Sequence, residues 1–371
     1  MGRDFCGHIF AVNSSCCKFA PMIEMDKQFM RRALQLARQG GGHTSPNPMV
    51  GAVIVHDGRI IGEGFHRCCG QAHAEVNAVN SVSASDRGLL PLSTLYVTLE
   101  PCSHHGKTPP CAQMLIEHRI GRVVVGMLDP FEKVSGRGVA QLREAGVEVE
   151  VGVLADRCRS LNERFVTAHT LHRPWVQLKW AQTADGFIGL PPEDNENPLH
   201  ISTAVTMALM HRERALCDAI VVGARTVAID NPSLTTRRWP GSSPLRVVLD
   251  RSRSIPADSK VVTDGLPTIV YNASLNKQCG PVEWVAMDTD SPDSWLADLY
   301  RRGITSVMVE GGTQVLSHLL EAGVWDEARI EVSPREVHRG VEAPRWPLGS
   351  VVGQRVDGNT LTWIKNDVKK V

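Results

Sequence analysis

The sequence predicts an α/β protein with two domains, and three observations lead to this prediction. The chain has 371 residues, which is more than one domain usually holds. Apolar runs typical of strands alternate with amphipathic segments typical of helices. The alternation pauses at a connector that ends in Pro174 and begins again at Trp175. We therefore expect one α/β domain over residues 25–168, a linker over 169–174 and a second α/β domain over 175–371.

The first domain is expected to begin with an amphipathic helix. Apolar residues recur on one face between Asp26, a suitable N-cap, and Gly40, a suitable stop. Two apolar runs joined by Asp57 and Gly58 then predict a β-hairpin, because Asp-Gly favours the tight turn between paired strands. The elements that follow are a helix from about 72, a strand over 93–99, a helix from about 111, a strand over 122–128, a helix over 138–146, a strand over 147–153, and a helix with a connector over 154–174. This order describes an α/β sandwich.

Residues 1–24 precede the first patterned helix. We expect a disordered extension, or upstream codons included through a misassigned start, because Met22 and Met25 stand just before that helix. The stretch lacks the apolar run and the cleavage pattern of a secretory signal. The ten cysteines are therefore interpreted as thiols or ligands rather than a disulfide framework, and a cytoplasmic location is expected.

The second half repeats the alternation of strands and helices. Strands are expected over 175–183, 218–223, 245–250, 267–271, 305–312 and 327–333, and helices over 202–214, 294–303 and 313–323. No Gly-x-Gly-x-x-Gly follows the first of these strands, so a Rossmann dinucleotide site is not predicted.

Charge and composition argue against two classes of partner. Lys+Arg and Asp+Glu each number 40, so the formal net charge is zero. A neutral chain gains little electrostatic attraction to nucleic acid or to an anionic membrane. Aromatic residues make up only 5% of the chain, which leaves few platforms for stacking bases. No segment approaches the roughly 20 apolar residues that cross a bilayer. We therefore expect neither a nucleic-acid partner nor a membrane partner.

Four side chains in the first half suggest a metal site. His73 and Glu75 stand at the start of an expected helix, and Cys102 and Cys111 follow in LEPCSHHGKTPPC. Taken singly, each could be an ordinary core residue, since histidines and cysteines are often buried for packing alone. As a set, His-x-Glu, then Pro-Cys after a strand, then a second Cys is the order found in zinc deaminases. We therefore predict Zn²⁺ bound by His73, Cys102 and Cys111.

The fourth side chain, Glu75, is predicted to carry protons. One imidazole and two thiolates leave a position on zinc open for water, whose pKa falls to about 7. Attack on an amidine-like carbon requires that this water lose a proton and that departing ammonia gain one. Glu75 is not expected to be a ligand, because residues two apart on a helix point in different directions. A zinc-stabilised binding module is the non-enzymatic alternative.

The spacing of the cysteines departs from the common deaminase signature. Eight residues separate Cys102 and Cys111, where that signature has two. Together with this insert, TSPNPMVGAVIV, HAEVNA and VTLEPCSHHGKTPPC resemble the deaminase half of the bifunctional riboflavin biosynthesis family, RibD, over residues 25 to about 168. The resemblance implies a cytidine-deaminase-like α/β/α sandwich. It also implies hydrolytic deamination of 2,5-diamino-6-(5-phosphoribosylamino)pyrimidin-4-one.

The same resemblance implies four contacts with that substrate. Asn47 and His66 would bind the pyrimidine, while His104 and Lys107 would lie near the ribose phosphate. An imidazole and an ammonium group in one loop can supply donors and charge to a phosphate without a globally basic surface. A nucleic-acid-editing deaminase is the alternative, and the neutral charge and this loop argue against it.

In the second half, Glu310-Gly311-Gly312-Thr313 ends an expected strand and opens an expected helix. Bare backbone amides at such a helix N-terminus can hold a cofactor phosphate, although a simple strand-to-helix turn would have the same sequence. Two further stretches, VQLKWAQTADGFI and DAIVVGARTVAIDNPSLTTR, together with VMVEGGTQVL resemble the reductase half of the same family. That resemblance implies a dihydrofolate-reductase-like fold, NADPH as cofactor, and reduction of the ribosyl group to ribityl.

The resemblance also implies roles for residues of the second half. Those expected to line NADPH are Gln182, His200, Thr226, Asp230, Gly311, Gly312 and Thr313. Those expected to hold the substrate are Arg214, Leu234, Arg237 and Glu310. Lys179, Asp230 and Glu310 would surround the carbon that accepts hydride. A small-molecule substrate and a homo-oligomer are implied as well.

The chain departs from the family pattern ahead of the first reductase helix. Many members have Ser-x-Trp-Ile there, whereas this chain has Pro198-Leu199-His200-Ile201. A hydroxyl donor and a large ring are therefore missing, and residues 190–198 look like a mobile loop. A deaminase whose second domain has reduced or lost activity is thus the alternative to a two-activity enzyme.

Overall fold

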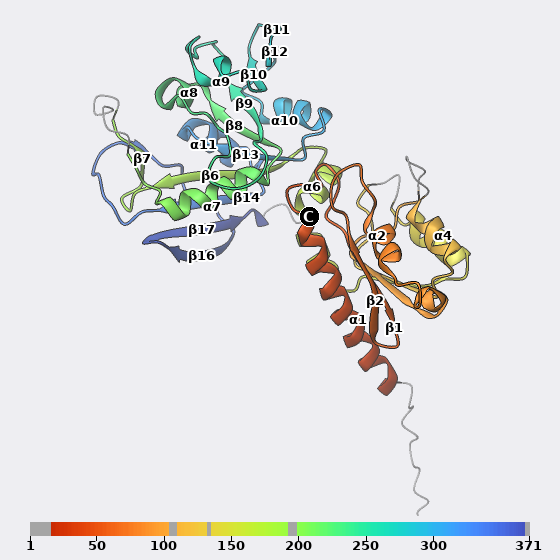
Figure 1. Cartoon of the computed structure of the whole chain (residues 1–371). Coiled ribbons are helices and arrows are strands. Elements are labelled where there is room, and N and C mark those ends of the chain that lie inside the picture. The colour runs from red at the N-terminus through yellow and green to blue at the C-terminus, as the bar shows by residue number, and fades with distance from the viewer. Residues whose placement is uncertain (1–15, 104–109, 132–134, 192–198, 368–371) are drawn as a thin grey trace, which may run out of the picture. The chain divides into compact units, whose positions relative to one another are not determined.

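The chain folds as two α/β units, in agreement with the predicted fold class (Figure 1). A computed structural model describes residues 16–103, 110–131, 135–191 and 199–367. Unit 1 comprises Met1–Gly41 and Met49–Leu161, and unit 2 comprises Gly42–Pro48 and Asn162–Val371. Within the described residues, none of the helices combines the length and hydrophobicity that a bilayer-spanning segment requires.

Unit 1 is built on a 5-stranded sheet with the order β2-β1-β3-β4-β5. Its strands are β1 (Gly51–His56), β2 (Arg59–Phe65), β3 (Thr94–Val97), β4 (Arg122–Val125) and β5 (Glu148–Val151). Its helices are α1 (Cys16–Ala37), α2 (Ala74–Ser81), α3 (Cys111–Glu117), α4 (Arg137–Glu144) and α5 (Ala155–Leu161), with 3-10 turns η1 (Arg38–Gly40) and η2 (Arg87–Leu92).

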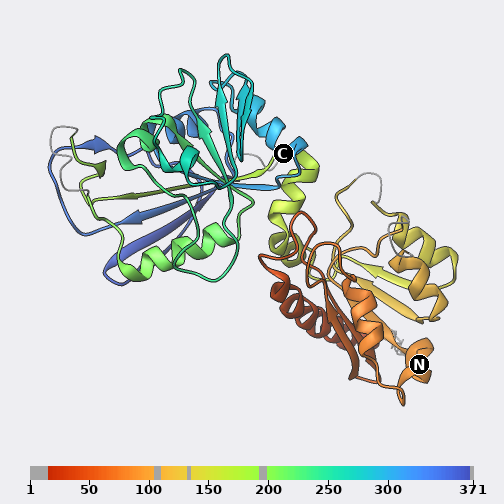
Figure 2. The same ribbon diagram turned by 45° about the horizontal axis from the view of Figure 1, so that its top comes forward.

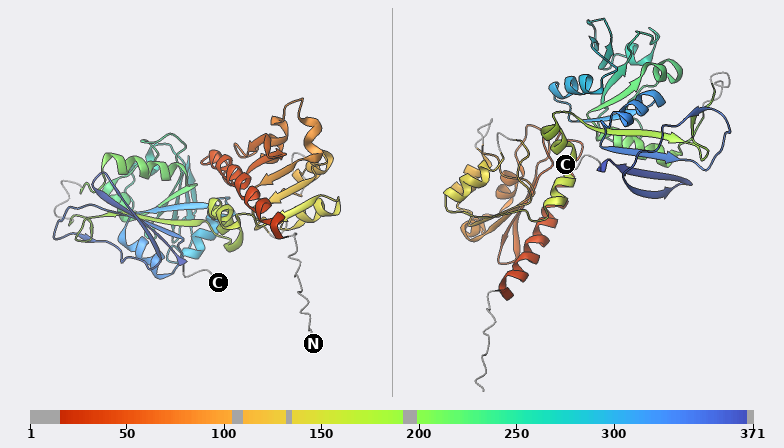
Figure 3. Two further views of the ribbon diagram at one scale, coloured as in Figure 1. Left: turned by 90° about the horizontal axis from the view of Figure 1, so that it is seen from below. Right: turned by 180° about the vertical axis from the view of Figure 1, so that it is seen from behind.

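The sheet of unit 1 is the middle of three layers. On one face, Ala78 of α2, Leu115 of α3 and Leu142 of α4 join a common apolar core with the strands. On the other face lies α1, where the Phe29 and Tyr96 rings meet with centroids 5.3 Å apart. Both views in Figure 3 show α1 running along the strands of this unit. Helices therefore pack on both faces of the sheet, as in an α/β/α sandwich.

The predicted hairpin forms at the predicted turn. β1 and β2 pair antiparallel, with His56 opposite Arg59. Asp57 and Gly58 between them both have positive φ, 46° and 74°. Two consecutive left-handed residues match the right-handed twist of the strands, which is why Asp-Gly favours this turn.

The first helix begins earlier than predicted. α1 starts at Cys16, so residues 16–24, assigned to an extension by the sequence, are helical, and residues 1–15 lie outside the described residues. Asp26 is not an N-cap. It is buried inside the helix, where it accepts hydrogen bonds from Tyr96 Oη at 2.8 Å and from both Nη atoms of Arg122 at 2.8 and 2.9 Å. Those partners are distant in sequence, so local pattern alone cannot reveal them.

Unit 2 contains a 10-stranded sheet with the order β11-β12-β10-β9-β8-β13-β6-β14-β17-β16, and a small sheet of β15 and β7. Figure 2 shows this unit from another side. Its strands are β6 (Trp175–Gln182), β7 (Phe187–Gly189), β8 (Ala219–Gly223), β9 (Leu245–Leu249), β10 (Thr268–Asn272), β11 (Lys277–Cys279), β12 (Val282–Ala286), β13 (Ser306–Glu310), β14 (Glu327–Val332), β15 (Val341–Glu342), β16 (Ser350–Val356) and β17 (Asn359–Lys365). Its helices are α6 (Glu163–Leu171), α7 (Ala204–Ala215), α8 (Ala224–Asp230), α9 (Lys260–Thr263), α10 (Pro292–Arg301) and α11 (Thr313–Glu321).

Helices cover both faces of the large sheet. Trp295 of α10 and Leu316 of α11 pack on one face, with alternate residues of β6, β13 and β14. Val227 of α8 and Val261 of α9 pack on the other face, against β8, β9 and β10. α7 lies on this second face too, because its Arg214 binds Glu310, the register neighbour of Lys179. The second face therefore carries polar side chains beneath a helix.

The segment between the units belongs to unit 2 from Asn162 onward. Where the sequence predicts one helix and a connector, the structure has α5 and α6, separated by Asn162. α6 packs on the first strand of unit 2, since the Arg164 guanidinium lies 5.0 Å from the Trp175 ring centroid. Because α6 packs on β6, unit 2 includes residues before Trp175, where the sequence predicts the second domain to begin.

β16 and β17 are not among the predicted elements. They form an antiparallel hairpin around Asp357 and Gly358, whose φ values of 50° and 87° repeat the turn seen in unit 1. The Asp-Gly dipeptide was therefore a usable signal. β16 occupies the edge of the sheet and its side chains are mostly exposed, so it lacks the alternating apolar pattern of an internal strand.

Candidate functional site

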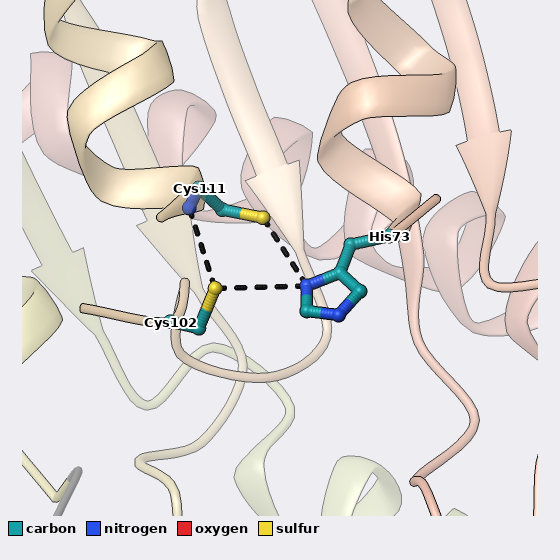
Figure 4. A group of neighbouring side chains, drawn as sticks. All are labelled: His73, Cys102 and Cys111. Carbon is teal, nitrogen blue, oxygen red and sulfur yellow. Dashed lines mark hydrogen bonds between the residues drawn. The ribbon is translucent and has the colours of Figure 1, made fainter. Parts of the chain in front are cut away.

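The three predicted zinc ligands converge in unit 1. His73 Nδ1 lies 3.6 Å from Cys102 Sγ and 3.3 Å from Cys111 Sγ. Figure 4 shows the three side chains pointing toward one another. All three ligand atoms fall within 4.8 Å of one another. Cys111 is buried, and His73 and Cys102 are partly buried. Three side chains up to 38 positions apart in the chain therefore point at one small volume.

Local structure explains how each ligand is placed. His73 is the N-cap of α2, and Cys111 is the first residue of α3. The backbone N–H of Cys111 donates to Cys102 Sγ at 3.3 Å, and the N–H of Ala112 donates to the Cys102 carbonyl at 3.1 Å. These donors belong to the first turn of a helix, where N–H groups have no partner within the helix and favour a negative charge nearby.

The donor set fits zinc. Zinc prefers imidazole nitrogen and thiolate sulfur at about 2.0–2.3 Å in a tetrahedral arrangement, which separates neighbouring donor atoms by about 3.5 Å. The separations of 3.6 and 3.3 Å from His73 Nδ1 match this requirement. Three protein ligands are also the number found in catalytic zinc sites.

Glu75 is buried beside the ligands, in the first turn of α2. Burial, and then the negative charge of Cys102, raise the pKa of Glu75 to about 7. The pKa of Cys102 is lowered to about 4, first by its hydrogen bond with the Cys111 side chain and also by His73. The cluster therefore combines a thiolate with a carboxyl group that can both accept and release a proton near neutral pH.

Of the four predicted pyrimidine and phosphate contacts, His66 is brought to the cluster. Its ring meets that of His73 edge to face, with centroids 5.5 Å apart, and it is buried. Asn47 lies in the segment Gly42–Pro48, which groups with unit 2, and its role toward the pyrimidine stays a prediction. His104 and Lys107 lie outside the described residues, as does the segment 192–198 with Pro198.

In unit 2, the predicted hydride-site residues Lys179 and Glu310 lie side by side. Glu310 ends β13 and pairs in register with Lys179 of β6, so both side chains are on the face that α7 covers. Arg214, from the last turn of α7, binds Glu310 through two hydrogen bonds, Nε to Oε1 at 3.0 Å and Nη2 to Oε2 at 2.6 Å. This parallel pairing of a guanidinium and a carboxylate fixes the orientation of both groups.

The charges at this face explain the proton affinities of its residues. Burial alone would raise the pKa of Glu310, but Arg214 and then Lys179 outweigh it and lower that pKa to about 2. Burial lowers the pKa of Lys179, an effect that Glu310 and Glu331 partly oppose. Glu310 is therefore an anion across the whole physiological range.

The predicted phosphate cradle begins with two glycines of positive φ. Gly311 and Gly312 have φ values of 118° and 69°, and Gly312 is the N-cap of α11. A Cβ on Gly311 would lie 3.1 Å from Thr226 Oγ1, so the glycine turn passes close to another predicted cofactor residue. The Thr313 hydroxyl donates to the Glu342 carbonyl at 2.7 Å. Four of the predicted NADPH residues, Thr226, Gly311, Gly312 and Thr313, thus lie at or beside one helix N-terminus.

The predicted substrate loop is tied to α7. Arg214 Nη1 donates to the Thr235 carbonyl at 3.1 Å, and the backbone N–H of Arg237 donates to His211 Nδ1 at 3.1 Å. Leu234 is buried with a positive φ of 55°. These contacts place Arg214, Leu234 and Arg237 in one neighbourhood.

Three predicted residues are not joined to the Lys179–Glu310 pair by the contacts of the described part of the chain. Asp230 is exposed at the end of α8. The Gln182 side chain accepts a hydrogen bond from Trp180 Nε1 at 2.8 Å, on the opposite face of the sheet from Lys179. His200 is exposed, and its carbonyl accepts from Arg335. Their roles toward cofactor and substrate stay predictions.

Two residues of this face escaped the sequence prediction. Arg329 of β14 is buried, pairs in register with Lys179, and has an Nη1 atom without a hydrogen-bond partner among the described residues. His211 of α7 is buried, and burial followed by Arg214 lowers its pKa to about 4, so the ring is neutral. The sequence did contain a usable signal for Arg329. Glu327, Arg329 and Glu331 alternate along β14, an internal strand of the sheet, and charged residues are rarely buried unless they are paired.

Comparison with known proteins agrees with these two sites. Residues 23–127 match the cytidine and deoxycytidylate deaminase zinc-binding region, and residues 174–337 match the RibD C-terminal domain. Fold, metal ligands and these matches define the class of protein: a zinc-binding deaminase domain followed by a RibD C-terminal domain.

Relatives match along most of the chain. The riboflavin biosynthesis protein RibD of Aquifex aeolicus is 39% identical over 325 residues, covering 86% of this chain and 89% of that protein. The RibD of Escherichia coli K12 is 32% identical over 331 residues, covering 84% and 88%. A diaminohydroxyphosphoribosylaminopyrimidine deaminase/5-amino-6-(5-phosphoribosylamino)uracil reductase from Thermotoga maritima has a similar structure, with a TM-score of 0.83 and 39% identity over 93% of this chain and 99% of that one. The chain belongs to the RibD family.

Proposed function

We propose that this chain catalyses two steps of riboflavin biosynthesis. The first is zinc-dependent hydrolytic deamination of 2,5-diamino-6-(5-phosphoribosylamino)pyrimidin-4-one. The second is NADPH-dependent reduction of the ribosyl group of the product to ribityl. A deaminase with an inactive second domain is not favoured, because the RibD C-terminal domain match extends over 174–337 and Arg214 binds Glu310, the register neighbour of Lys179.

The observation that carries the deaminase proposal is the meeting of His73, Cys102 and Cys111 beside Glu75. When bound, zinc would supply an acidified water molecule as the nucleophile. Glu75 would take the proton from that water and give a proton to the departing ammonia, because this carboxyl lies buried beside the ligands in the first turn of α2. His66, buried against His73, would orient the pyrimidine.

In unit 2, the chain's residues would hold the substrate while NADPH supplies hydride. The ribosylamine can open to an imine, which is the form that accepts hydride. Lys179 would stabilise negative charge on the substrate's oxygens, and Glu310, fixed as an anion by Arg214, would favour positive charge on its nitrogen. Gly311 and Gly312 would give a cofactor phosphate access to the N–H groups of α11.

The deaminase proposal is tested with Glu75→Gln in the full-length chain. We expect zinc content to be unchanged, because Glu75 is not a ligand, and ammonia release to fall by about 10²–10⁴-fold, the usual contribution of a general acid–base group. Metal analysis and an ammonia assay on the diaminopyrimidine substrate measure both.

A matched control makes this test specific. Glu144→Gln introduces the same chemical change at an exposed position of α4 and should leave ammonia release unchanged. Ammonia release by Glu75→Gln at the wild-type rate would refute the assigned role.

The second activity is tested by mixing the deaminated substrate and NADPH with the wild-type chain. We expect the absorbance of NADPH to fall as it is oxidised, and an absorbance that stays constant would refute the reductase proposal.

Three finer statements belong to the same proposal. We propose a cytoplasmic enzyme that forms a homo-oligomer and has no nucleic-acid substrate. The neutral net charge supports the last point, because binding of nucleic acid depends on a concentration of positive charge. Light scattering of the purified chain and retention on single-stranded RNA at low salt test the second and third statements.

A further inference from the structure

Glu100 is a buried carboxylate next to the predicted zinc site. It follows β3, precedes Cys102 by two residues, and exposes only 4% of its surface. A buried carboxylate is costly unless hydrogen bonds replace the water it has lost. The hydrogen-bond partners of Glu100 therefore show which parts of the chain this carboxylate holds together.

Four backbone N–H groups donate to the two oxygens of Glu100. Asp129 and Gly136 donate to Oε2 at 3.1 and 2.9 Å. Gly138 and Val139 donate to Oε1 at 2.9 and 3.2 Å. The last two belong to the first turn of α4, where N–H groups have no partner within the helix. The carboxylate thus binds the segment after β4 and the start of α4 to the end of β3.

Gly138 brings α4 against the chain between Glu100 and Cys102. A Cβ at this position would lie 2.0 Å from the Pro101 carbonyl oxygen. No side chain fits at that distance unless the backbone of Pro101 or of α4 moves. The missing side chain of Gly138 therefore sets how closely the helix approaches the ligand segment.

The same helix is linked to the second cysteine. Gln141 of α4 donates to Gln113 of α3 at 3.2 Å, and α3 begins at Cys111. The N–H of Cys111 in turn donates to Cys102 Sγ at 3.3 Å. Hydrogen bonds and short chain segments therefore form a closed ring from Glu100 through α4 and α3 to Cys102.

We infer that Glu100 and Gly138 are positioning residues for the zinc site: they set where Cys102 Sγ lies relative to Cys111 and His73. The inference rests on the proposed zinc-dependent deaminase. Neither residue is a ligand. A carboxylate suits the task because it accepts through both oxygens and donates through neither, which an amide of the same shape cannot do.

The first test is Glu100→Gln in the full-length chain. Its amide nitrogen would face two N–H donors, so two of the four hydrogen bonds are lost in either orientation of the group. We expect zinc affinity to fall by about 10–100-fold, as is usual when the residues that orient metal ligands are changed. Competition with a chromophoric chelator measures the affinity. The thiolate-to-cobalt absorption of the Co²⁺-loaded chain should also change, because it reports the ligand geometry directly.

The second test is Gly138→Ala, which keeps the carboxylate and moves the helix. We expect the same loss of zinc affinity and the same spectral change. Matched controls are Glu144→Gln at an exposed site of α4, and Gly88→Ala, where an added Cβ meets no atom within 4 Å. Both controls should bind zinc as the wild type does, and all four variants should keep NADPH-dependent reduction, whose residues lie in unit 2.

The remaining outcomes also decide the question. Wild-type zinc affinity and an unchanged cobalt spectrum in both test variants would overturn the inference. So would loss of amide protection in β1 and β3 at saturating zinc in both variants, measured by hydrogen exchange, because the residues would then serve only the fold. If the wild-type chain itself binds no zinc, the proposed function fails first, and that result is distinct from either of these.

Discussion

Glu75 and Glu310 are both buried carboxyl groups, yet their surroundings give them opposite proton affinities. Burial and the Cys102 thiolate raise the pKa of Glu75 to about 7. At Glu310 burial is outweighed by Arg214 and Lys179, which lower the pKa to about 2. A group that titrates near neutrality can shuttle protons, whereas one that is always ionised can hold a cation and orient a substrate. The environment of each carboxyl therefore matches the role proposed for it.

The depressed pKa of Glu310 predicts a pH-dependent contribution to stability. A carboxyl whose folded pKa lies below its ordinary value of 4.5 stabilises the fold above that value, and the contribution disappears as pH falls from 4.5 to about 2. The full contribution is about 3 kcal/mol. We expect Glu310→Gln to lower the free energy of unfolding at pH 7, and the difference from wild type to shrink as pH falls through this window.

Tryptophan fluorescence during urea unfolding measures this effect, because all 8 tryptophans lie in unit 2. Glu321→Gln, at an exposed position of α11, is the matched control and should match the wild type at every pH. A stability difference for Glu310→Gln that stays constant from pH 7 to pH 3 would contradict the prediction.

At the scale of elements, glycines in a strand determine how closely a ligand-bearing helix can approach. β2 carries Gly62 and Gly64 on the face covered by α2. A Cβ on Gly64 would lie 2.3 Å from the Ala78 nitrogen and 2.5 Å from the Ala74 oxygen. Both atoms belong to the backbone of α2, whose N-cap is His73 and whose first turn holds Glu75. The packing of this helix on the sheet thus fixes the positions of His73 and Glu75 together.

We therefore predict that Gly64→Ala displaces α2. An added methyl group in such tight packing costs about 1–3 kcal/mol, because backbone atoms must move. Zinc affinity and ammonia release should both fall, since His73 and Glu75 move with the helix. Chelator competition and the ammonia assay give the two values. Gly88→Ala, which has open space for its Cβ, should change neither, and wild-type zinc binding by Gly64→Ala would contradict the role assigned to this contact.

At the scale of the whole molecule, each unit has its own apolar core and its own set of reactive residues. The core of unit 1 centres on residues such as Leu95 and Val123, and that of unit 2 on residues such as Leu178 and Val309. The predicted zinc ligands all belong to unit 1, and Lys179, Arg214 and Glu310 all belong to unit 2. The two chemistries therefore depend on different parts of the chain.

This division predicts a selective effect of metal removal. Dialysis of the full-length chain against a strong chelator should abolish ammonia release, because the nucleophilic water is no longer acidified. NADPH oxidation with the deaminated substrate should continue at the untreated rate. Restoring Zn²⁺ should restore ammonia release. Equal loss of both activities on chelation, reversed by Zn²⁺, would show that the units do not work independently.

The sequence by itself determined what depends on neighbouring residues. Alternating apolar runs predicted the two α/β units, and Asp57-Gly58 predicted a hairpin, because periodicity and turn preference act over a few residues. His73, Glu75, Cys102 and Cys111 were also identified from order and spacing alone, since their chemistry restricts which residues can serve. The sequence therefore identified these residues but did not give their positions in space.

Only the tertiary structure decided which distant groups meet. Asp26 binds Arg122 instead of capping a helix, and Glu100 accepts hydrogen bonds from backbone N–H groups 29 to 39 positions further along the chain. The polar alternation along β14 marks Arg329, but only strand order and the position of α7 bring Arg329 and His211 to the face of Lys179. Hydrogen bonds and charges act through space, so their partners follow from the fold rather than from the order of the residues.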